Sequence, residues 1–139
     1  MSRNTRYWIA TGLFCLAFAG SGVAHLVRAE PIAQAMAGLG YPAYVMTILG
    51  VAKLLGVAAL LAPGRPLLKE WAYAGFCFDL VGAAASHLFA GDALGHVLPP
   101  LALLALGALS HQLRPSDRRL AAAAAPAPQV ASPHPGART

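Results

Sequence analysis

WAYAGFCFDLVGAAASHLFA, residues 71–90, is the stretch that decides the fold of this chain. Its residues are mostly apolar, but a carboxylate, Asp79, lies near the middle and an imidazole, His87, lies further along. At about 1.5 Å of rise per residue, a helix of this length extends roughly 30 Å, which is the thickness of the hydrocarbon core of a bilayer. The stretch is therefore predicted to be a membrane-spanning helix that carries a buried acid.

Three further runs have the same character, and together the predicted spans cover residues 7–27, 42–62, 71–91 and 97–113. The first run could also be a cleaved signal peptide, but its apolar stretch continues past the small residues and three more spans follow. We therefore expect an all-α membrane protein, built as an antiparallel bundle of four transmembrane helices over residues 1–115.

The composition supports lipid as the solvent of this domain. Of the 139 residues, 58% are hydrophobic and 11% are charged, whereas roughly a quarter of an ordinary soluble domain is charged. The net charge of +5 does not indicate a nucleic-acid partner, because the basic residues lie between and outside the apolar runs rather than on one folded face. The bilayer is the predicted partner.

Proline and glycine mark the connections between the spans. Residues 32–37 could form a short interfacial helix, since Pro31 suits a first helical turn. Pro99 and Pro100 place the start of the fourth helix near Leu98, with a longer helix from about Ala93 as the alternative. Residues 116–139 are rich in Ala and Pro and are predicted to be a disordered cytoplasmic tail.

The distribution of lysine and arginine predicts the orientation. With the N-terminus inside, the two outer loops carry one basic residue, Arg28, and the cytoplasmic segments carry eight: Arg3, Arg6, Arg65, Lys69, Arg114, Arg118, Arg119 and Arg138. The positive-inside rule therefore places both termini in the cytoplasm. Aromatic belts are then expected at the inner interface (Tyr7, Trp8, Trp71 and Tyr73) and at the outer one (Tyr41 and Tyr44).

Two opposite charges lie at the same depth on consecutive helices. Lys53 is nine residues from the inner end of the second span and Asp79 is eight from that of the third, or roughly 12–14 Å in. An isolated charge at this depth costs roughly 3 kcal/mol, so the two are predicted to form an ion pair inside the bundle. The pair could fix the helix register, or it could handle protons or anchor a ligand.

Two histidines form a second polar layer near the outer surface. His25 and His87 lie roughly 27 and 24 Å above the inner ends of their spans, with Asp92 and His96 in the loop just beyond. Such a cluster could hold a metal, a haem or a quinone head group, or relay protons. The spacing is not a known ligand pattern, so haem and metal are disfavoured and a hydrogen-bonded cavity lining is the favoured interpretation.

The chain resembles the DoxX-like small membrane proteins. The resemblance lies in SGVAHL (21–26), LGYPAYVMTILGVAKLLGVAALL (39–61), LKEWAYAGFCFDLVGAAASHLFAGD (68–92) and LRP (113–115). It implies a four-helix inner-membrane bundle with His25, Lys53, Asp79 and His87 as its signature polar residues. One member is a small subunit of a thiosulfate:quinone oxidoreductase, which implies a quinone-linked redox role.

Three functions are compatible with these features, and no catalytic motif selects among them. The favoured one is an accessory protein or subunit of a quinone-linked redox system, with a membrane or soluble redox partner. The second is a small carrier or transporter of a lipophilic ligand, which four helices without an inverted repeat make less suitable as a monomer. The third is a structural membrane protein. A homo-oligomer is compatible with all three.

Overall fold

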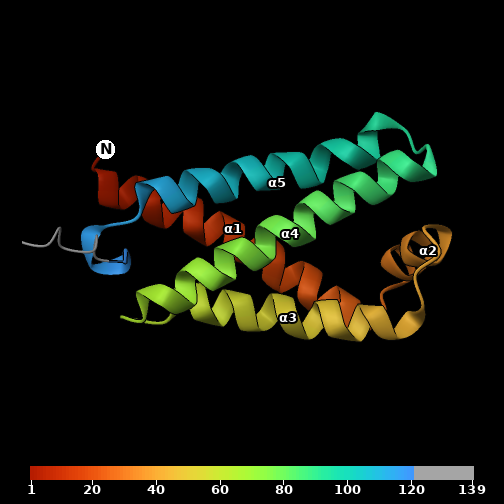
Figure 1. Cartoon of the computed structure of the whole chain (residues 1–139), viewed down its shortest axis with the longest axis horizontal. Coiled ribbons are helices and arrows are strands. Elements are labelled where there is room, and N and C mark those ends of the chain that lie inside the picture. The colour runs from red at the N-terminus through yellow and green to blue at the C-terminus, as the bar shows by residue number, and fades with distance from the viewer. Residues whose placement is uncertain (121–139) are drawn as a thin grey trace, which may run out of the picture.

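The protein is described by a computed structural model, which places residues 1–120; the remaining part of the predicted tail, 121–139, lies outside the described residues. Over the described range the chain is helical and contains no strand (Figure 1). The elements are α1 (Arg3–Leu26), α2 (Glu30–Gly38), α3 (Ala43–Leu61), α4 (Pro66–Ala90), α5 (Leu94–Leu113) and the 3₁₀ helix η1 (Ser116–Arg118).

Four of these helices, α1, α3, α4 and α5, are long and apolar enough to cross a membrane. They correspond to the four predicted spans, but two of them begin before the apolar run does. Ser2 caps α1 by accepting a hydrogen bond from the Thr5 amide at 3.1 Å, and α4 begins at Pro66, which needs no helical partner for its nitrogen. The Ser2 cap and Pro66 therefore set where α1 and α4 start, and the apolar run occupies only part of each helix.

The predicted start of the last span near Leu98 is wrong, and the alternative of a longer helix is right. Helix α5 begins at Leu94, and its first turn is closed by the His96 amide donating to the Ala93 carbonyl at 2.9 Å. Pro99 and Pro100 therefore lie inside the helix. They deprive only two carbonyls of helical donors, and this loss falls close to the helix end.

The predicted short interfacial helix is present as α2. Pro31 lies in its first turn, and the chain leaves it through Gly40, whose φ of +80° suits glycine. The Tyr41 amide donates to the Met36 carbonyl at 2.9 Å and so closes the turn that follows the helix. This helix contacts α1 and α3 and lies at one end of the molecule (Figure 1).

The contacts among the long helices form a ring. Helix α1 packs against α3 and α5, and α4 packs against the same two. We call one end of the ring the amino-terminal end; it holds the start of α1, the α3–α4 connection and the end of α5 (Figure 1). The opposite end, which holds α2 and the α4–α5 turn, is called the α2 end.

The core of the ring is aromatic. The rings of Phe18 and Phe76 lie 4.1 Å apart and those of Phe14 and Phe76 lie 5.3 Å apart, in tilted and edge-on geometries that favour aromatic pairs. The face of α1 on which residues recur at spacings of four and three is turned inward, because all five of its residues are buried: Thr11, Cys15, Phe18, Gly22 and His25.

Glycines allow close helix contact at some positions of the long helices and not at others. A Cβ on Gly50 would lie 2.9 Å from the Gly22 carbonyl oxygen, so α3 approaches α1 closely there. Gly56 is likewise tight against Phe76. Gly75 and Gly82 of α4 do not serve this purpose, since a Cβ on either would meet no atom of the described residues within 4 Å.

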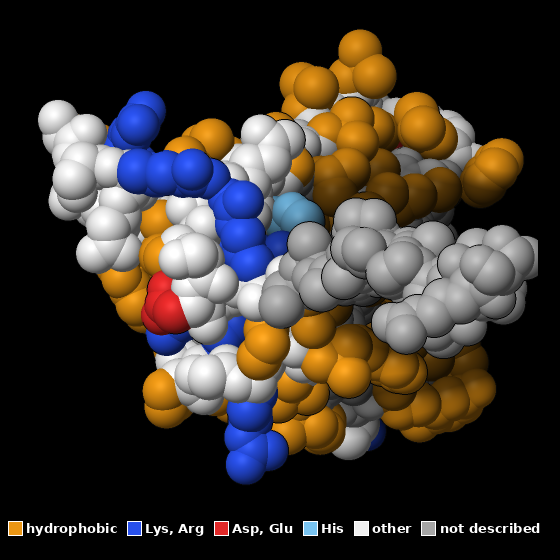
Figure 2. Space-filling view, turned by 60° about the vertical axis from the view of Figure 1, so that its left-hand side comes forward, with side chains coloured by type: hydrophobic (Ala, Val, Ile, Leu, Met, Phe, Trp, Pro, Cys, Tyr) orange, Lys and Arg blue, Asp and Glu red, His pale blue; other side chains and the backbone are white. Residues whose placement is uncertain are grey.

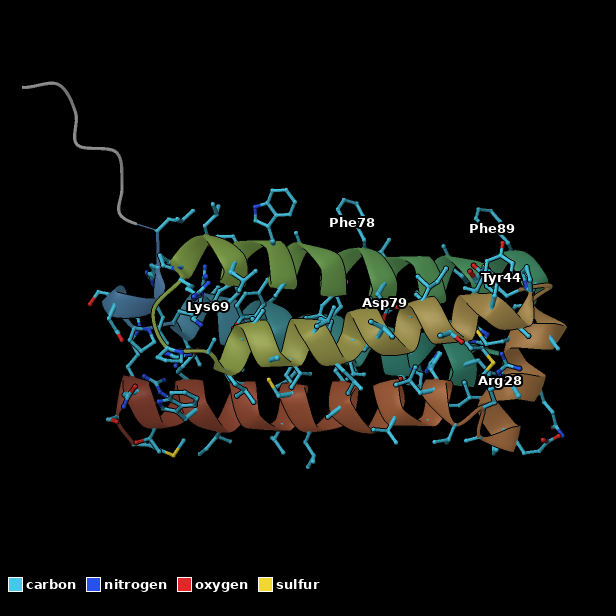
Figure 3. All side chains as sticks on the ribbon, turned by 90° about the horizontal axis from the view of Figure 1, so that it is seen from below. Arg28, Tyr44, Lys69, Phe78, Asp79 and Phe89 are labelled. Carbon is cyan, nitrogen blue, oxygen red and sulfur yellow. The ribbon has the colours of Figure 1, made fainter. Side chains whose placement is uncertain are left out.

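The outer surface of the ring suits lipid. Phe78 and Phe89 point away from the protein (Figure 3) and are 79% and 93% exposed. Trp71 and Tyr44 are also exposed, as an aromatic belt requires, but Tyr7 and Tyr73 are buried in the protein, so their assignment to the inner belt is wrong. Their hydroxyls serve internal contacts instead.

Basic side chains gather at the amino-terminal end (Figure 2). Seven of the eight residues predicted to lie inside fall in the described range, and Arg28 is the one counterpart toward the α2 end within that range. Residues 116–120, assigned to the tail, include η1 with its buried Arg118.

The glycine contacts predict that the same Gly→Ala substitution changes the free energy of unfolding differently at two positions. Gly50→Ala should lower the free energy of unfolding by about 1–3 kcal/mol, because its methyl group meets the backbone of α1. Gly75→Ala should leave stability unchanged or raise it by up to about 1 kcal/mol through helix propensity. Denaturant unfolding in detergent micelles measures both; equal effects would contradict the close approach.

Candidate ligand-binding cavity

A cavity of about 530 Å³ lies among the helices toward the α2 end, and all five α-helices contribute to its lining. The four residues singled out in the sequence, His25, Lys53, Asp79 and His87, all line it. The structure therefore brings together side chains from α1, α3 and α4 that lie far apart in the sequence.

Lys53 and Asp79 form the predicted ion pair. Lys53 Nζ lies 3.5 Å from Asp79 Oδ1, and the two side chains are 9% and 18% exposed. Helices α3 and α4 pack against each other, so the pair joins neighbouring helices at one depth. Its low exposure removes most competition from water, which strengthens the attraction between the charges.

His25 is fixed by its own helix. Its Nδ1 lies 2.7 Å from the Ser21 carbonyl oxygen. A carbonyl can only accept, so Nδ1 carries the proton, and in the neutral ring Nε2 is left as an acceptor. The imidazole is 7% exposed and lines the cavity. It thus offers a positioned acceptor to whatever occupies this space.

His87 belongs to a cluster at the cavity end. Its Nδ1 lies 2.6 Å from Asp92 Oδ2, and its ring stacks on that of His96 with 5.6 Å between centroids. Of the four residues expected to cluster, His87, Asp92 and His96 lie together here, and His96 belongs to the first turn of α5 rather than to a loop. His25 and His87 share the cavity, but the hydrogen bonds of their Nδ1 atoms lead to separate partners, Ser21 and Asp92.

A further polar contact was missed in the sequence. Tyr41, from the α2–α3 connection, shares a hydrogen bond of 2.6 Å with Ser86 of α4, whose hydroxyl also donates to the Gly82 carbonyl. Both Tyr41 and Ser86 line the cavity. The sequence placed Tyr41 in an aromatic belt, and nothing in its spacing indicated a partner that lies 45 residues away.

The remaining lining is largely apolar, with the aromatic, aliphatic and proline side chains Phe18, Leu49, Leu80, Pro99 and Leu103. An apolar space with a few placed polar groups is typical of small-molecule sites. Among residues 1–120, no three His, Cys, Asp or Glu side chains converge as a metal site would need. The arrangement can hold a ligand that has an apolar body and a polar head.

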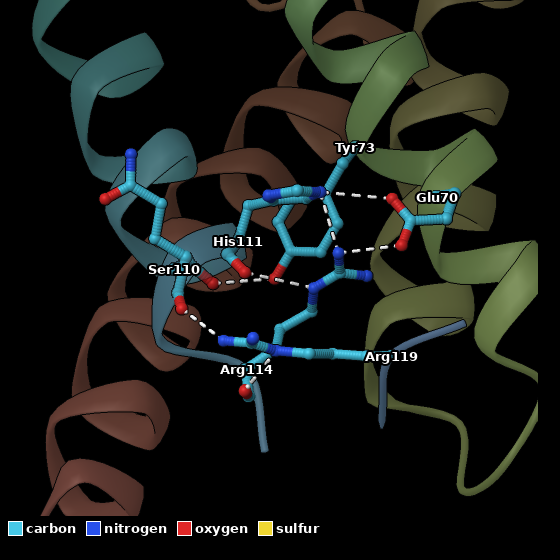
Figure 4. Close-up of polar contacts among 7 residues, drawn as sticks. Glu70, Tyr73, Ser110, His111, Arg114 and Arg119 are labelled. Carbon is cyan, nitrogen blue, oxygen red and sulfur yellow. Dashed lines mark hydrogen bonds and ion pairs between the residues drawn. The ribbon is translucent and has the colours of Figure 1, made fainter. Parts of the chain in front are cut away.

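A second polar cluster, at the amino-terminal end, was also missed (Figure 4). Arg114 Nη2 donates to Glu70 Oε1 at 2.7 Å, and His111 Nε2 lies 3.0 Å from Glu70 Oε2. The contact of His111 with Glu70 joins α5 to α4. Beside it, the Ser110 hydroxyl contacts the Tyr73 hydroxyl at 2.7 Å and the Thr11 hydroxyl at 2.6 Å.

Cations at this end also satisfy the carbonyls that end α3. Lys69, which is fully buried, donates from Nζ to the carbonyls of Ala59 and Ala62. Arg118 donates to the Leu60 carbonyl at 3.0 Å and lies over the Trp8 ring, 4.5 Å from its centroid. Positive groups at a helix C-terminus stabilise the carbonyls and the helix dipole.

Four apolar spanning helices around buried charges define a multi-pass α-helical membrane protein. The model of the DoxX-like family matches residues 9–110, so the chain belongs to this family and the resemblance noted in the sequence is confirmed. No curated protein and no solved structure matches the sequence.

The ion pair predicts strong coupling between two substitutions. Lys53→Leu or Asp79→Asn alone should lower the free energy of unfolding by about 3 kcal/mol, the lower end of the range for breaking a buried pair, because one charge loses its partner. The double variant should recover most of this loss. Unfolding in detergent micelles tests the cycle, and losses that simply add would refute the coupling.

Proposed function

We propose that this DoxX-like protein binds a quinone or a similar lipophilic molecule with a polar head, as an accessory protein or subunit of a quinone-linked redox system. The observation that carries the proposal is that four ionisable side chains from three helices line one cavity whose other walls are largely apolar. A polar head and an apolar body would each find a matching part of this space.

The head group would lie near the ion pair. Lys53 Nζ is a donor for a carbonyl oxygen, while Asp79 keeps the lysine charge balanced. His25 Nε2 is an acceptor for a hydroxyl in the reduced form of the ligand. A quinone takes up or releases electrons together with protons. Its head group therefore needs a hydrogen-bond donor for the carbonyl form and a hydrogen-bond acceptor for the hydroxyl form.

The His87–Asp92 pair lies where protons could leave the cavity. A carboxylate at 2.6 Å orients the imidazole, and His96 stacks on the same ring. The pair is also closer to the α2 end than Lys53 and Asp79 are, since Asp92 follows the end of α4. In this proposal His87 accepts a proton from the bound head group and passes it outward.

The membrane setting is part of the proposal. The four long helices would form an antiparallel bundle in the inner membrane, with both termini in the cytoplasm. The gathering of basic residues at the amino-terminal end supports this orientation. The α2 end, with the cavity, would then face the outer leaflet. A redox partner or a second copy of the chain would associate with this bundle.

Ligand binding can be tested with a short-chain quinone and a cavity-filling substitution. Ala83 lines the cavity, so Ala83→Leu should weaken the binding of decyl-ubiquinone by at least about tenfold, roughly 1.4 kcal/mol. The control is Ala105→Leu on the exposed side of α5, which should leave binding unchanged. Equilibrium dialysis of the purified protein measures both.

The functional alternatives give different outcomes in the same experiment. A structural protein would bind no quinone in any variant. A lipophilic-ligand carrier would bind apolar molecules without quinone heads equally well, and the double Lys53→Leu/Asp79→Asn variant would bind as the native protein does. Mass spectrometry of the gently extracted protein would identify a native ligand or redox partner in the same preparation.

The orientation can be tested by cysteine labelling. In a Cys15→Ala/Cys77→Ala background, Ser116→Cys at the amino-terminal end should react with a membrane-impermeant maleimide only after the cells are permeabilised. Ala93→Cys, in the α4–α5 turn, should react in intact cells. Both native residues are exposed, so burial does not confound the comparison. The reverse pattern would place the termini outside.

A further inference from the structure

A second cavity, of about 460 Å³, lies at the amino-terminal end of the ring. It is far larger than the share of one water molecule in the liquid, about 30 Å³. Its charged lining residues are Arg3, Glu70, Arg114 and Arg119, so cations predominate, and His111 also lines it. The proposed quinone site does not include this cavity, and its lining residues are different.

Part of this charge has a structural use. Arg3 donates to the Gln112 carbonyl at 3.0 Å, Arg114 Nε donates to the His111 carbonyl at 3.1 Å, and Arg119 Nε donates to the Arg114 carbonyl at 2.7 Å. These bonds satisfy the last carbonyls of α5. Each guanidinium has five N–H donors, however, so capping uses only a fraction of them.

The guanidinium of Arg114 is enclosed within the protein, so the positive charge available to a ligand lies on other residues. The Arg114 side chain is 4% exposed, and Nη2 is engaged by Glu70. Nη1 is buried and has no hydrogen-bond partner among residues 1–120. Glu70 can balance one cation in this group, whereas Arg3 and Arg119 add two more beside the same cavity. Arg3 and Arg119 are exposed beside this cavity, so their remaining N–H groups are available to an anion there.

An apolar space adjoins this basic cavity. It has a volume of about 330 Å³ and lies between α4 and α5, lined mainly by Phe14, Phe76, Leu80 and Leu104. Glu70 and His111 line both spaces, so the two meet at the polar cluster of Figure 4. An occupant of both would have an anionic head at the helix ends and a hydrocarbon chain along the helices.

We propose that this composite space binds the phosphate group and one acyl chain of an anionic membrane phospholipid. The arginines lie where the spanning helices end, which is the level of lipid head groups. Basic pockets between transmembrane helices are suited to anionic head groups. A free phosphate ion would satisfy the arginines, but it would leave the apolar space without an occupant.

Native mass spectrometry of the full-length protein in a neutral detergent tests the site. Dioleoyl-phosphatidylglycerol should bind at least tenfold more tightly than dioleoyl-phosphatidylcholine. Arg3→Gln/Arg119→Gln should remove this preference, because both residues line the cavity. The control, Arg6→Gln/Arg65→Gln, removes the same charge from exposed positions at the same end and should change binding less than twofold.

Two further measurements decide between a lipid and another anion. Ala108→Phe, in the apolar space, should weaken phosphatidylglycerol binding, whereas Ala105→Phe should not; thermal unfolding verifies that all variants are folded. Inorganic phosphate should not compete with the lipid at equal concentration. Equal affinity for both lipids, equal losses in the arginine control, or full competition by phosphate would each overturn the proposal.

Discussion

Charge balance inside hydrocarbon is the constraint on which the rest of this structure depends. Lys53 and Asp79 are each too costly to leave alone at their depth, and at 3.5 Å they neutralise one another across α3 and α4. Because both residues lie in helices, their contact is compatible with only a narrow range of shifts of one helix along the other. That register brings His87 of α4 to the same cavity as His25 of α1.

Features set by hydrophobicity and charge could be read from the sequence. The four spans follow from apolar runs, the ion pair follows from two depths counted along helices, and the buried face of α1 follows from helical periodicity. Each of these depends on one helix or on a pair of neighbours. The cavity lining by His25, Lys53, Asp79 and His87 extends the same reasoning to three helices.

Features set by packing between distant segments could not be read in this way. The start of α5 depends on a turn at Ala93. Gly75 and Gly82 resemble Gly50 and Gly56 in sequence, although a Cβ on either would meet no atom of the described residues within 4 Å. The cluster around Arg114 joins residues more than forty positions apart. Its one sequence signal was the series of polar residues at the end of α5, which an interfacial position explains equally well.

Helix α2 forms one wall of the larger cavity yet stands outside the ring of long helices; among the described elements it contacts only α1 and α3. Only Met36 of its residues is buried. Displacing α2 therefore breaks few of the contacts that hold the four spans together, and its free energy cost is a fraction of that of global unfolding. A molecule could therefore enter or leave the cavity by displacement of α2 without unfolding of the four long helices.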